Sequence, residues 1–472
     1  MSGELVIDHT PFGLKAALVD DGRLLEVGLA DGSSDEARGQ IRLGRVRAID
    51  RDLDAAFVDC GLDADAYLGA RHARFLTDGP SAPSKRQGLR IDRLVSEGQG
   101  VVVQVRQGSN GDKGPRVTGD VALLGCYLEF HPRRQGAGVS ERLARTPDAA
   151  AQRKRATALF PDAGITLRRA ASFASDAALN AEHDRLRAQW RQIELAATAT
   201  TPPARLDPVE DPLHRLLCDL IAPDLERIVV GDQATLVRAR RWLAEWWPAM
   251  ADRLASLPDP FETTGIAEQL EDALRPEVPL AGGGSLIIQA TAALTAIDVN
   301  GGGRRALEAN LAATGEIARQ LRLRRIGGTV VVDFIDLPSR SARDRLLDAL
   351  RGAVADDPAP VQVFPMSRLG LVELSRKRTG PSLAEALGRP CTACEGTGTL
   401  PSLRWRAERL MQELQACRAV RLAVRAAPDL HRYLSGAGGA DWQASTRRSG
   451  RAVTLEVDAA LVPGGHRIME LS

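Results

Sequence analysis

Asp298 and Asp333 are the two residues whose type and spacing point most clearly to chemistry. Asp298 lies where the apolar run of residues 294–299 gives way to glycines, and Asp333 lies in the β-branched run of residues 328–335. Residues 304–325, between the two runs, carry apolar side chains at helical spacing. A strand, helix and strand of this length favour a parallel, right-handed crossover, and parallel strands end at the edge of a sheet where ligands bind. We therefore expect Asp298 and Asp333 to converge there.

The side chain of Asn300 shares a strand face with Asp298, because side chains alternate along a strand. Two carboxylates suit Mg²⁺ or Mn²⁺, hard cations that complete their oxygen shell with water and substrate phosphate. Asp333 interrupts a run predicted to be buried, where an uncompensated carboxylate costs roughly several kcal/mol unless a cation or donor satisfies it. The alternative is that Asp298 makes an Asx turn and Asp333 pairs with an arginine.

The predicted helix between the two strands is strongly basic. Beside a cation site these charges would hold a phosphate backbone, whereas the alternative is an ordinary solvated helix face. A second basic segment follows at residues 375–379. The helical arginines are Arg304, Arg305, Arg319, Arg322, Arg324 and Arg325.

Cys391 and Cys394 form a Cys-x-x-Cys pair that Glu-Gly-Thr-Gly follows. A structural zinc needs four ligands, so this pair supplies half of a site. Two chains that each contribute a pair would share one Cys₄ zinc at a dimer contact. The alternatives are a plain turn and a redox dithiol, although a redox pair usually opens a helix. The other cysteines are isolated, at positions 60, 126, 218 and 417.

Residues 39–125 predict a small β-barrel, and residues 5–8, 14–19 and 24–27 predict short strands before it. The stretch Ala-Ala-Phe-Val-Asp-x-Gly, with an aromatic residue ten positions after its Phe, resembles the S1 type of OB-fold, an RNA-binding barrel. On that barrel Phe57 and Tyr67 would be exposed platforms on which bases stack, and Lys113 would contact phosphate. The alternative places the two rings in the barrel core.

The composition sets limits on the kind of protein. A chain of 472 residues is long enough for several domains, and a net charge of +1 means that a nucleic-acid surface must be a local patch. Six cysteines do not make a disulfide framework, and we find no signal sequence or membrane-spanning run. We expect a cytoplasmic protein.

Taken together, these residues resemble the catalytic core of the ribonuclease E/G family over nearly the whole chain. The most specific marks are residues 294–300, 316–324, 327–336 and 370–378, with the Cys391/Cys394 pair. The chain ends soon after this core, so the resemblance is to the short, ribonuclease G-like members rather than to the longer ones with a disordered scaffold.

The resemblance implies an α+β multidomain fold. It contains an RNase H-like subdomain with an inserted S1-type OB-fold barrel, a 5′-sensor subdomain and a DNase I-like α/β catalytic subdomain. A zinc link and a small C-terminal α/β domain follow. The implied order is first RNase H-like segment (1–38), S1 barrel (39–125), 5′-sensor-like subdomain (126–204), second RNase H-like segment (205–275), catalytic subdomain (276–388), zinc link (389–400) and C-terminal domain (401–472).

The resemblance also implies an Mg²⁺-dependent endoribonuclease that acts on single-stranded RNA. The residues matching Asp298 and Asp333 hold the metal, and the one matching Asn300 orients a carboxylate or the scissile phosphate. Phe57, Tyr67 and Lys113 match RNA-contacting positions. Cys391 and Cys394 would provide the zinc shared between chains of a homodimer or homotetramer.

Departures from the family pattern concern the pocket for a 5′-monophosphate. Gly125 and Arg168 match that pocket, but Glu129, Arg169 and Pro360 stand at its other positions. An acid repels phosphate and proline has no N–H donor, so the pattern argues against a strong preference for 5′-monophosphorylated RNA. Ala292 also stands where many members have Glu before the first catalytic strand, which would lower activity.

Three hypotheses for function follow from the sequence. In the first, a metal-activated water cleaves RNA and leaves a 5′-phosphate and a 3′-hydroxyl, in processing of ribosomal RNA or turnover of mRNA. The main alternative is an RNA-binding paralogue with weakened or lost catalysis. A third is a zinc-linked assembly protein that uses the fold as a scaffold.

Overall fold

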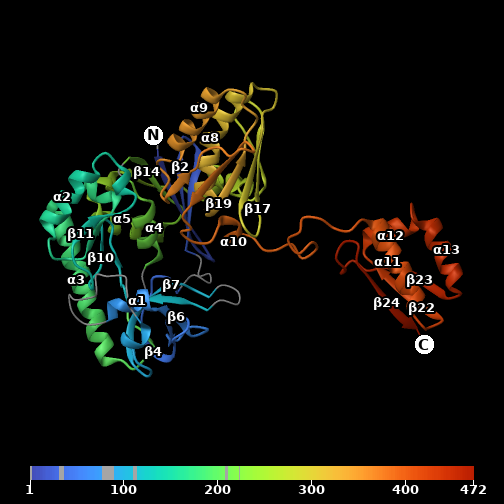
Figure 1. Cartoon of the computed structure of the whole chain (residues 1–472), viewed down its shortest axis with the longest axis horizontal. Helices are drawn as coiled ribbons and strands as arrows, with labels where there is room; N and C mark the ends of the chain where they lie inside the picture. The colour runs from blue at the N-terminus through green and yellow to red at the C-terminus, as the bar shows by residue number, and fades with distance from the viewer. Residues whose placement is uncertain are drawn as a thin grey trace. The chain divides into compact units, whose positions relative to one another are not determined.

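A computed structural model describes residues 3–30, 37–76, 90–109, 114–207, 211–222 and 224–471 (Figure 1). The chain divides into two compact units, residues 1–383 and 384–472. It is a mixed α+β protein with a closed five-stranded barrel in its first unit. Among the described residues, no helix is both long and apolar enough to cross a membrane.

The first sheet joins the N-terminal strands to strands more than 200 residues later. Its order is β15-β14-β1-β2-β3, with β1 parallel to β14 and antiparallel to β2. The predicted strands at residues 5–8, 14–19 and 24–27 lie within β1, β2 and β3. Its strands are β1 (Gly3–Thr10), β2 (Gly13–Asp20), β3 (Arg23–Ala30), β14 (Leu225–Val230) and β15 (Leu254–Ser256), with helices α4 (Pro212–Leu220), α5 (Gln233–Trp246), α6 (Pro260–Thr263) and α7 (Ile266–Asp272).

The barrel is inserted after β3, as the sequence predicts. Its strands follow the order β4-β5-β6-β8-β7, and pairing of β4 with β7 closes it. Val46, Val58, Leu68 and Val103 belong to its core, and most of the residues on either side of them along the strands are less buried. The strands are β4 (Ile41–Asp50), β5 (Ala55–Asp59), β6 (Ala66–Gly69), β7 (Gly100–Gln107) and β8 (Arg116–Thr118); β13 (Ala204–Arg205) extends β4, and α1 (Ala70–Ala73) follows β6.

A small four-stranded sheet comes next, in the order β11-β12-β10-β9. Glu182 of the long helix α3 is buried and accepts the backbone N–H groups of Cys126, Tyr127 and Leu128, at 2.7 to 2.9 Å. This carboxylate holds the turn between β9 and β10 against α3. The elements are β9 (Leu123–Leu124), β10 (Leu128–Phe130), β11 (Ala137–Val139), β12 (Ile165–Leu167), α2 (Ala149–Leu159) and α3 (Asp176–Ala199).

The sheet that carries the two aspartates has six strands in the order β16-β17-β18-β19-β21-β20. Helices α8 and α9 cover one face of it, and their apolar side chains form one core with the buried side chains of the strands (Figure 1). The other face is open. The elements are β16 (Glu277–Pro279), β17 (Ser285–Ala290), β18 (Thr295–Asn300), α8 (Ala306–Leu323), β19 (Gly328–Asp333), α9 (Arg340–Ala353), β20 (Val361–Val363) and β21 (Leu371–Arg376).

The C-terminal unit has a three-stranded sheet, in the order β23-β22-β24, with its own core around Leu410, Leu422 and Leu430. A segment without helix or strand, residues 388–402, precedes it and contains both Cys391 and Cys394. The elements are α10 (Leu383–Leu387), which begins at the last residue of the first unit, α11 (Leu403–Ala416), β22 (Arg421–Ala426), α12 (Pro428–Ser435), α13 (Gly439–Ser449), β23 (Ala452–Val457) and β24 (His466–Leu471).

Candidate active site

The parallel pairing of β18 with β19 places Asp298 directly beside Asp333, as partners in the sheet register. Along β18, Thr295, Ile297 and Val299 are buried, whereas Asp298 and its face partners are exposed. Neighbouring strands lie about 4.8 Å apart, so two carboxylates on one face of paired residues are close enough to share a cation. The convergence expected from the sequence is therefore present.

Asn300 lies one pleat further along the same face. Its Nδ2 donates a hydrogen bond to Oδ2 of Asp298 at 3.0 Å, which fixes the orientation of that carboxylate. Asp298 thus does not make the Asx turn that the sequence left open. The Asp333 side chain makes no ion pair with any described residue.

The argument that Asp333 is a buried carboxylate is wrong. Asp333 is exposed, because alternation along β19 puts it on the open face with Thr329 and Val331. Val330 and Val332 point into the core. The case for a cation therefore rests on electrostatics between two neighbouring carboxylates and not on a desolvation cost. A divalent ion between them would offset that repulsion.

Two local contacts fix the ends of β18 and β19. Asn310 of α8 is fully buried; its Nδ2 donates to the carbonyl oxygen of Ile335 at 2.7 Å, and its Oδ1 accepts the Ile335 N–H at 3.1 Å. After β18, Gly302 has a φ of +59°, and a Cβ there would meet the Gly284 nitrogen at 2.3 Å. Glycine is thus required for the close backbone approach next to Asn300.

The ligand set fits a hard cation that needs few protein ligands. Among the residues that the structure describes, no group of three or more His, Cys, Asp or Glu side chains is placed to hold a metal. Asp298 and Asp333 supply two carboxylates, a set compatible with Mg²⁺, which often takes one or two carboxylates and fills its shell with water and phosphate. A zinc catalytic site would need more nitrogen or sulfur ligands.

The arginines in the second half of α8 do not serve this site. Arg319 donates to the carbonyl oxygen of Leu24 and pairs with Glu316, and Arg322 pairs with Glu26 at 2.7 Å. These partly buried arginines attach α8 to β3, so they are neither a phosphate surface nor a solvated face. Arg376, in the second basic segment, is buried and pairs with Asp357 at 2.9 Å.

On the barrel, Phe57 and Tyr67 face each other across β5 and β6, with ring centroids 6.3 Å apart and an edge-to-face geometry. Both rings are half-buried and lie outside the barrel's core cluster. The guanidinium of Arg116 lies over the Tyr67 ring, 5.5 Å from its centroid. Lys113 lies outside the described residues.

A hollow of about 370 Å³ opens beside Tyr67, and sequence reasoning missed the three arginines that line it, Arg71, Arg106 and Arg116. Arg106 Nη1 donates to Nε2 of His72 at 2.9 Å. Burial, with Arg106 and Arg71 nearby, lowers the pKa of His72, so this ring stays neutral at pH 7. The hollow therefore combines an aromatic ring with cations.

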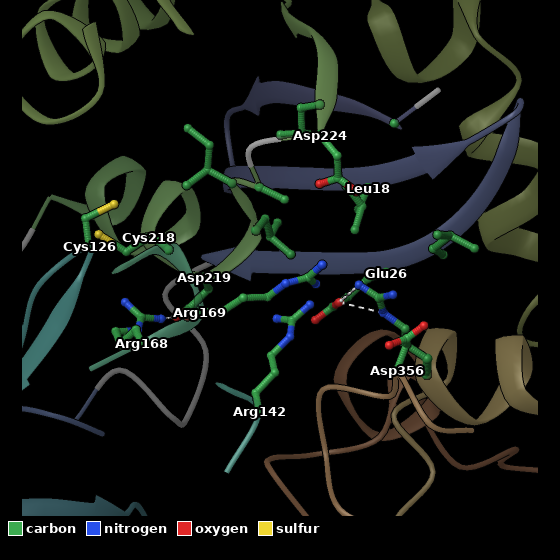
Figure 2. A pocket seen from close by; sticks show the side chains of 18 of the residues that line it. Leu18, Glu26, Cys126, Arg142, Arg168, Arg169, Cys218, Asp219, Asp224 and Asp356 are labelled. Atoms are coloured by element: carbon green, nitrogen blue, oxygen red, sulfur yellow. Dashed lines mark hydrogen bonds and ion pairs between the residues drawn. The ribbon is translucent and has the colours of Figure 1, made fainter. Parts of the chain in front are cut away.

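A cavity of about 290 Å³ is lined by Glu129, Arg168 and Arg169, whereas Pro360 does not line it. Figure 2 shows Arg168 and Arg169 in this cavity. Arg168 donates to the Gly125 carbonyl oxygen at 2.6 Å and to Oδ1 of Asp219 at 3.0 Å. Although burial opposes the charge of Arg168, the Asp219 carboxylate raises its pKa. Arg168 is thus already neutralised by a residue that the sequence did not single out.

Two other arginines point into this cavity toward Glu26 (Figure 2). Neither Arg142 nor Arg169 makes a side-chain hydrogen bond or ion pair with a described residue. Burial, together with Arg322 and Arg169, lowers the pKa of Arg142 to about 10. The imidazole of His131, 3.6 Å from the carboxylate, lowers the pKa of Glu129, which therefore stays ionised and adds negative charge to the cavity.

In the C-terminal unit, the turn after Cys391 is arranged as in half of a metal site. The backbone N–H groups of Cys394 and Ala393 hydrogen-bond to the Cys391 sulfur and lower its pKa, which favours the thiolate that zinc binds. Glu395 and Gly396 then have φ values of +50° and +88°. Cys391 is exposed and Cys394 half-buried, so both sulfurs are accessible. No helix begins at this pair, which argues against the redox alternative.

Comparison with known proteins shows which sequences the chain resembles. Residues 122–379 match the model of the Ribonuclease E/G family. The chain is 32% identical to ribonuclease G of Escherichia coli K12 over 92% of its own length and 93% of that protein. It is also 32% identical to ribonuclease G of Haemophilus influenzae, over 91% of each chain. It is 34% identical to ribonuclease E of a Synechocystis strain over 77% of its length, and there it spans 56% of the relative.

Proposed function

The chain belongs to the ribonuclease E/G family and is an endoribonuclease of RNA processing, and from that premise we propose that it cleaves single-stranded RNA with Mg²⁺. The single observation that carries the proposal is the register of β18 with β19, which sets Asp298 beside Asp333 on an open sheet face. Such a face leaves room for an extended strand of RNA.

We assign each sheet of the first unit to a subdomain. The barrel is an S1-type RNA-binding domain inserted in an RNase H-like subdomain, whose sheet joins β1–β3 with β14 and β15. The four-stranded sheet of residues 123–167 belongs to a 5′-sensor subdomain, and the six-stranded sheet is the DNase I-like catalytic subdomain. A zinc link and a small C-terminal domain complete the chain. The seven segment boundaries expected from the sequence remain predictions.

The catalytic residues act on a scissile phosphate that lies over the open face. Asp298 and Asp333 would hold Mg²⁺, which supplies an activated water and stabilises negative charge when bound. Asn300 keeps the Asp298 carboxylate oriented, through the 3.0 Å hydrogen bond. In-line attack breaks the bond from phosphorus to the 3′-oxygen, so the products carry a 5′-phosphate and a 3′-hydroxyl.

RNA reaches this face across the barrel. Phe57 and Tyr67 offer ring faces for bases, and the hollow lined by Arg71, Arg106 and Arg116 offers cations for the phosphates between them. Lys113 completes the predicted contact set, although it lies outside the described residues. A local patch of this kind is what a chain with a net charge of +1 needs to bind RNA.

In this proposal the 5′-end pocket binds a terminal phosphate only weakly. Gly125, Arg168 and Arg169 would contact a terminal phosphate, but Asp219 already occupies Arg168 at 3.0 Å, and Glu129 adds a second negative charge. A 5′-phosphate would have to displace Asp219 to gain its ion pair. The chain should therefore cleave RNA with little regard for its 5′ end.

Processing of ribosomal RNA precursors or turnover of mRNA, in the cytoplasm, is the proposed biological role. The alternative is a paralogue that binds RNA and cleaves it poorly. Ala292, which favours that alternative, lies in the exposed turn before β18, at the opposite end of the strand from Asn300. Because Ala292 is at this distant end, it does not take a direct part in the proposed metal site. We therefore favour the enzyme over the RNA-binding paralogue.

Replacing Asp333 by Asn should abolish cleavage of a labelled, A/U-rich single-stranded RNA and leave its binding intact. The substitution removes a charged ligand but keeps the size of the side chain. Cleavage and electrophoretic mobility would be measured in Mg²⁺ on the same RNA. If Asp333→Asn cuts as fast as the wild type, the metal assignment is wrong; if neither protein cuts but both bind, the protein is the RNA-binding paralogue.

Replacing Tyr67 by Ala should weaken RNA affinity by about 1–3 kcal/mol, the usual contribution of one stacked base. Phe12→Ala is the matched control, because Phe12 is 83% exposed but lies on the turn between β1 and β2. Fluorescence anisotropy with a short labelled RNA would give both dissociation constants. Equal losses in the two variants would mean that Tyr67 is no specific platform.

Replacing Asp219 by Ala should create a preference for 5′-monophosphorylated RNA. The wild type is expected to cleave 5′-phosphate and 5′-hydroxyl substrates at similar rates. The variant frees Arg168 for a phosphate, and a charge-assisted hydrogen bond favours the phosphorylated substrate by about tenfold. Asp224→Ala, another aspartate of the same cavity, serves as the control. A strong preference in the wild type, or an unchanged ratio in Asp219→Ala, contradicts the blocking role of Asp219.

Zinc should link two chains through Cys391 and Cys394. Native mass spectrometry is expected to show an even number of chains with one zinc for every two, and a dimer or a tetramer would both satisfy this. Replacing both cysteines by serine should release the zinc and halve the assembly. One zinc per chain, or an assembly of unchanged mass after the double substitution, would rule out the shared site.

A further inference from the structure

A third carboxylate lies on the open face of the catalytic sheet. β21 runs antiparallel to β19, and its register pairs Asp333 with Leu371 and Val331 with Glu373. Glu373 is exposed, while Val372 and Leu374 on either side of it are buried in the core. Glu373 therefore shares the face of Asp298 and Asp333, one strand beyond Asp333.

The register places Glu373 diagonally from Asp333. Diagonal neighbours in an antiparallel pair have Cα atoms roughly 7–8 Å apart, within reach of long side chains. Glutamate has one methylene more than aspartate, which lengthens the reach of its carboxyl group toward the Asp333 side of the face. It does not join Asp298 and Asp333 in a three-ligand cluster, because the described residues include no such metal-holding group.

Among the described residues, no side chain neutralises Glu373 through a hydrogen bond or ion pair. Its carboxyl group makes no hydrogen bond or ion pair with a described residue, whereas the nearest basic residues along the chain have partners. Arg376 is bound to Asp357, and Lys377 lies 3.0 Å from Glu141. A free negative charge on a face that receives RNA opposes phosphate binding, so a neutral residue would serve binding better.

We propose that Glu373 is a further catalytic residue, the general base that takes a proton from the attacking water. The assignment rests on the proposed function, in which the scissile phosphate lies over Asp298 and Asp333. The water oxygen bonds to phosphorus as the bond to the 3′-oxygen breaks. The water's proton passes to the Glu373 carboxylate, and the leaving 3′-oxygen takes a proton from solvent. Glu373 then returns its proton to solvent.

Position distinguishes Glu373 from the other acids nearby. Glu277 is on the same face, but it pairs with Ile287, which in turn pairs with Asp298, so it lies two strands from the carboxylate pair. Asp336 follows the end of β19, beyond the segment that Asn310 holds. Glu373 alone among these three is on the strand next to Asp333 and within its diagonal reach.

The test is cleavage by Glu373→Gln beside Glu277→Gln and Asp333→Asn, with RNA affinity and Mn²⁺ affinity measured for each. Glu373→Gln should lower kcat by about 10²–10⁴-fold, the usual contribution of a general base, with RNA and Mn²⁺ dissociation constants unchanged. Glu373→Asp should recover some of the rate, because it keeps the acid but shortens it. Glu277→Gln should match the wild type, and Asp333→Asn should lose Mn²⁺ affinity.

The outcomes separate this proposal from the one on which it rests. Wild-type kcat in Glu373→Gln, with an inactive Asp333→Asn, overturns the role of Glu373 and leaves the enzyme assignment standing. Loss of Mn²⁺ affinity in Glu373→Gln makes it a metal ligand and overturns the general-base role. A raised KM with unchanged kcat makes it a binding residue, which also overturns it. Full activity of Asp333→Asn overturns the proposed function itself.

Discussion

The parallel pairing of β18 with β19 is the constraint on which the rest of the site depends. It brings two carboxylates that are 35 positions apart in the sequence onto the same row of one sheet face. Two like charges in this position repel each other, and the fold has to hold them there. It does so with a core of β-branched and aliphatic side chains beneath the sheet and with the amide of Asn310. The close approach of the Gly302 backbone to Gly284 holds the turn that follows β18.

The arginines show how charge is divided between structure and function. Those of α8 bind carboxylates and carbonyl groups of β3, and Arg376 forms a buried pair with Asp357. Removing one partner of such a buried pair typically costs about 3–5 kcal/mol, so these residues belong to the architecture. Other arginines line the hollow on the barrel and the cavity of Arg142 and Arg169. The open sheet face keeps its negative charge, which is what a cation site needs.

Much of this could be predicted from the sequence because it depends on local periodicity. The alternation of buried and exposed residues along β18, the β-branched run of β19 and the apolar spacing of α8 together indicated that Asp298 and Asp333 would meet. The barrel strands were predictable for the same reason. Phe57 and Tyr67 could be put on one barrel, though their exposure depends on strand pairing that only the structure shows.

What could not be predicted depends on contacts between distant segments. Helical spacing shows that α8 is amphipathic, but not that its arginines meet β3, some 295 residues away in the sequence. For the same reason Asp219 was missed as the partner of Arg168, and Glu373 was recognised only as a member of a motif. The argument that Asp333 is buried failed because a β-branched run was taken as covered on both faces, whereas helices cover only one.

The most direct test of the central claim is the position of a Mn²⁺ ion in crystals of the protein. An anomalous difference map should show one peak between the carboxylates of Asp298 and Asp333, and no peak there in Asp333→Asn crystals. A peak only elsewhere, or none at a Mn²⁺ concentration that supports cleavage, would contradict the assignment of this sheet face as the catalytic centre.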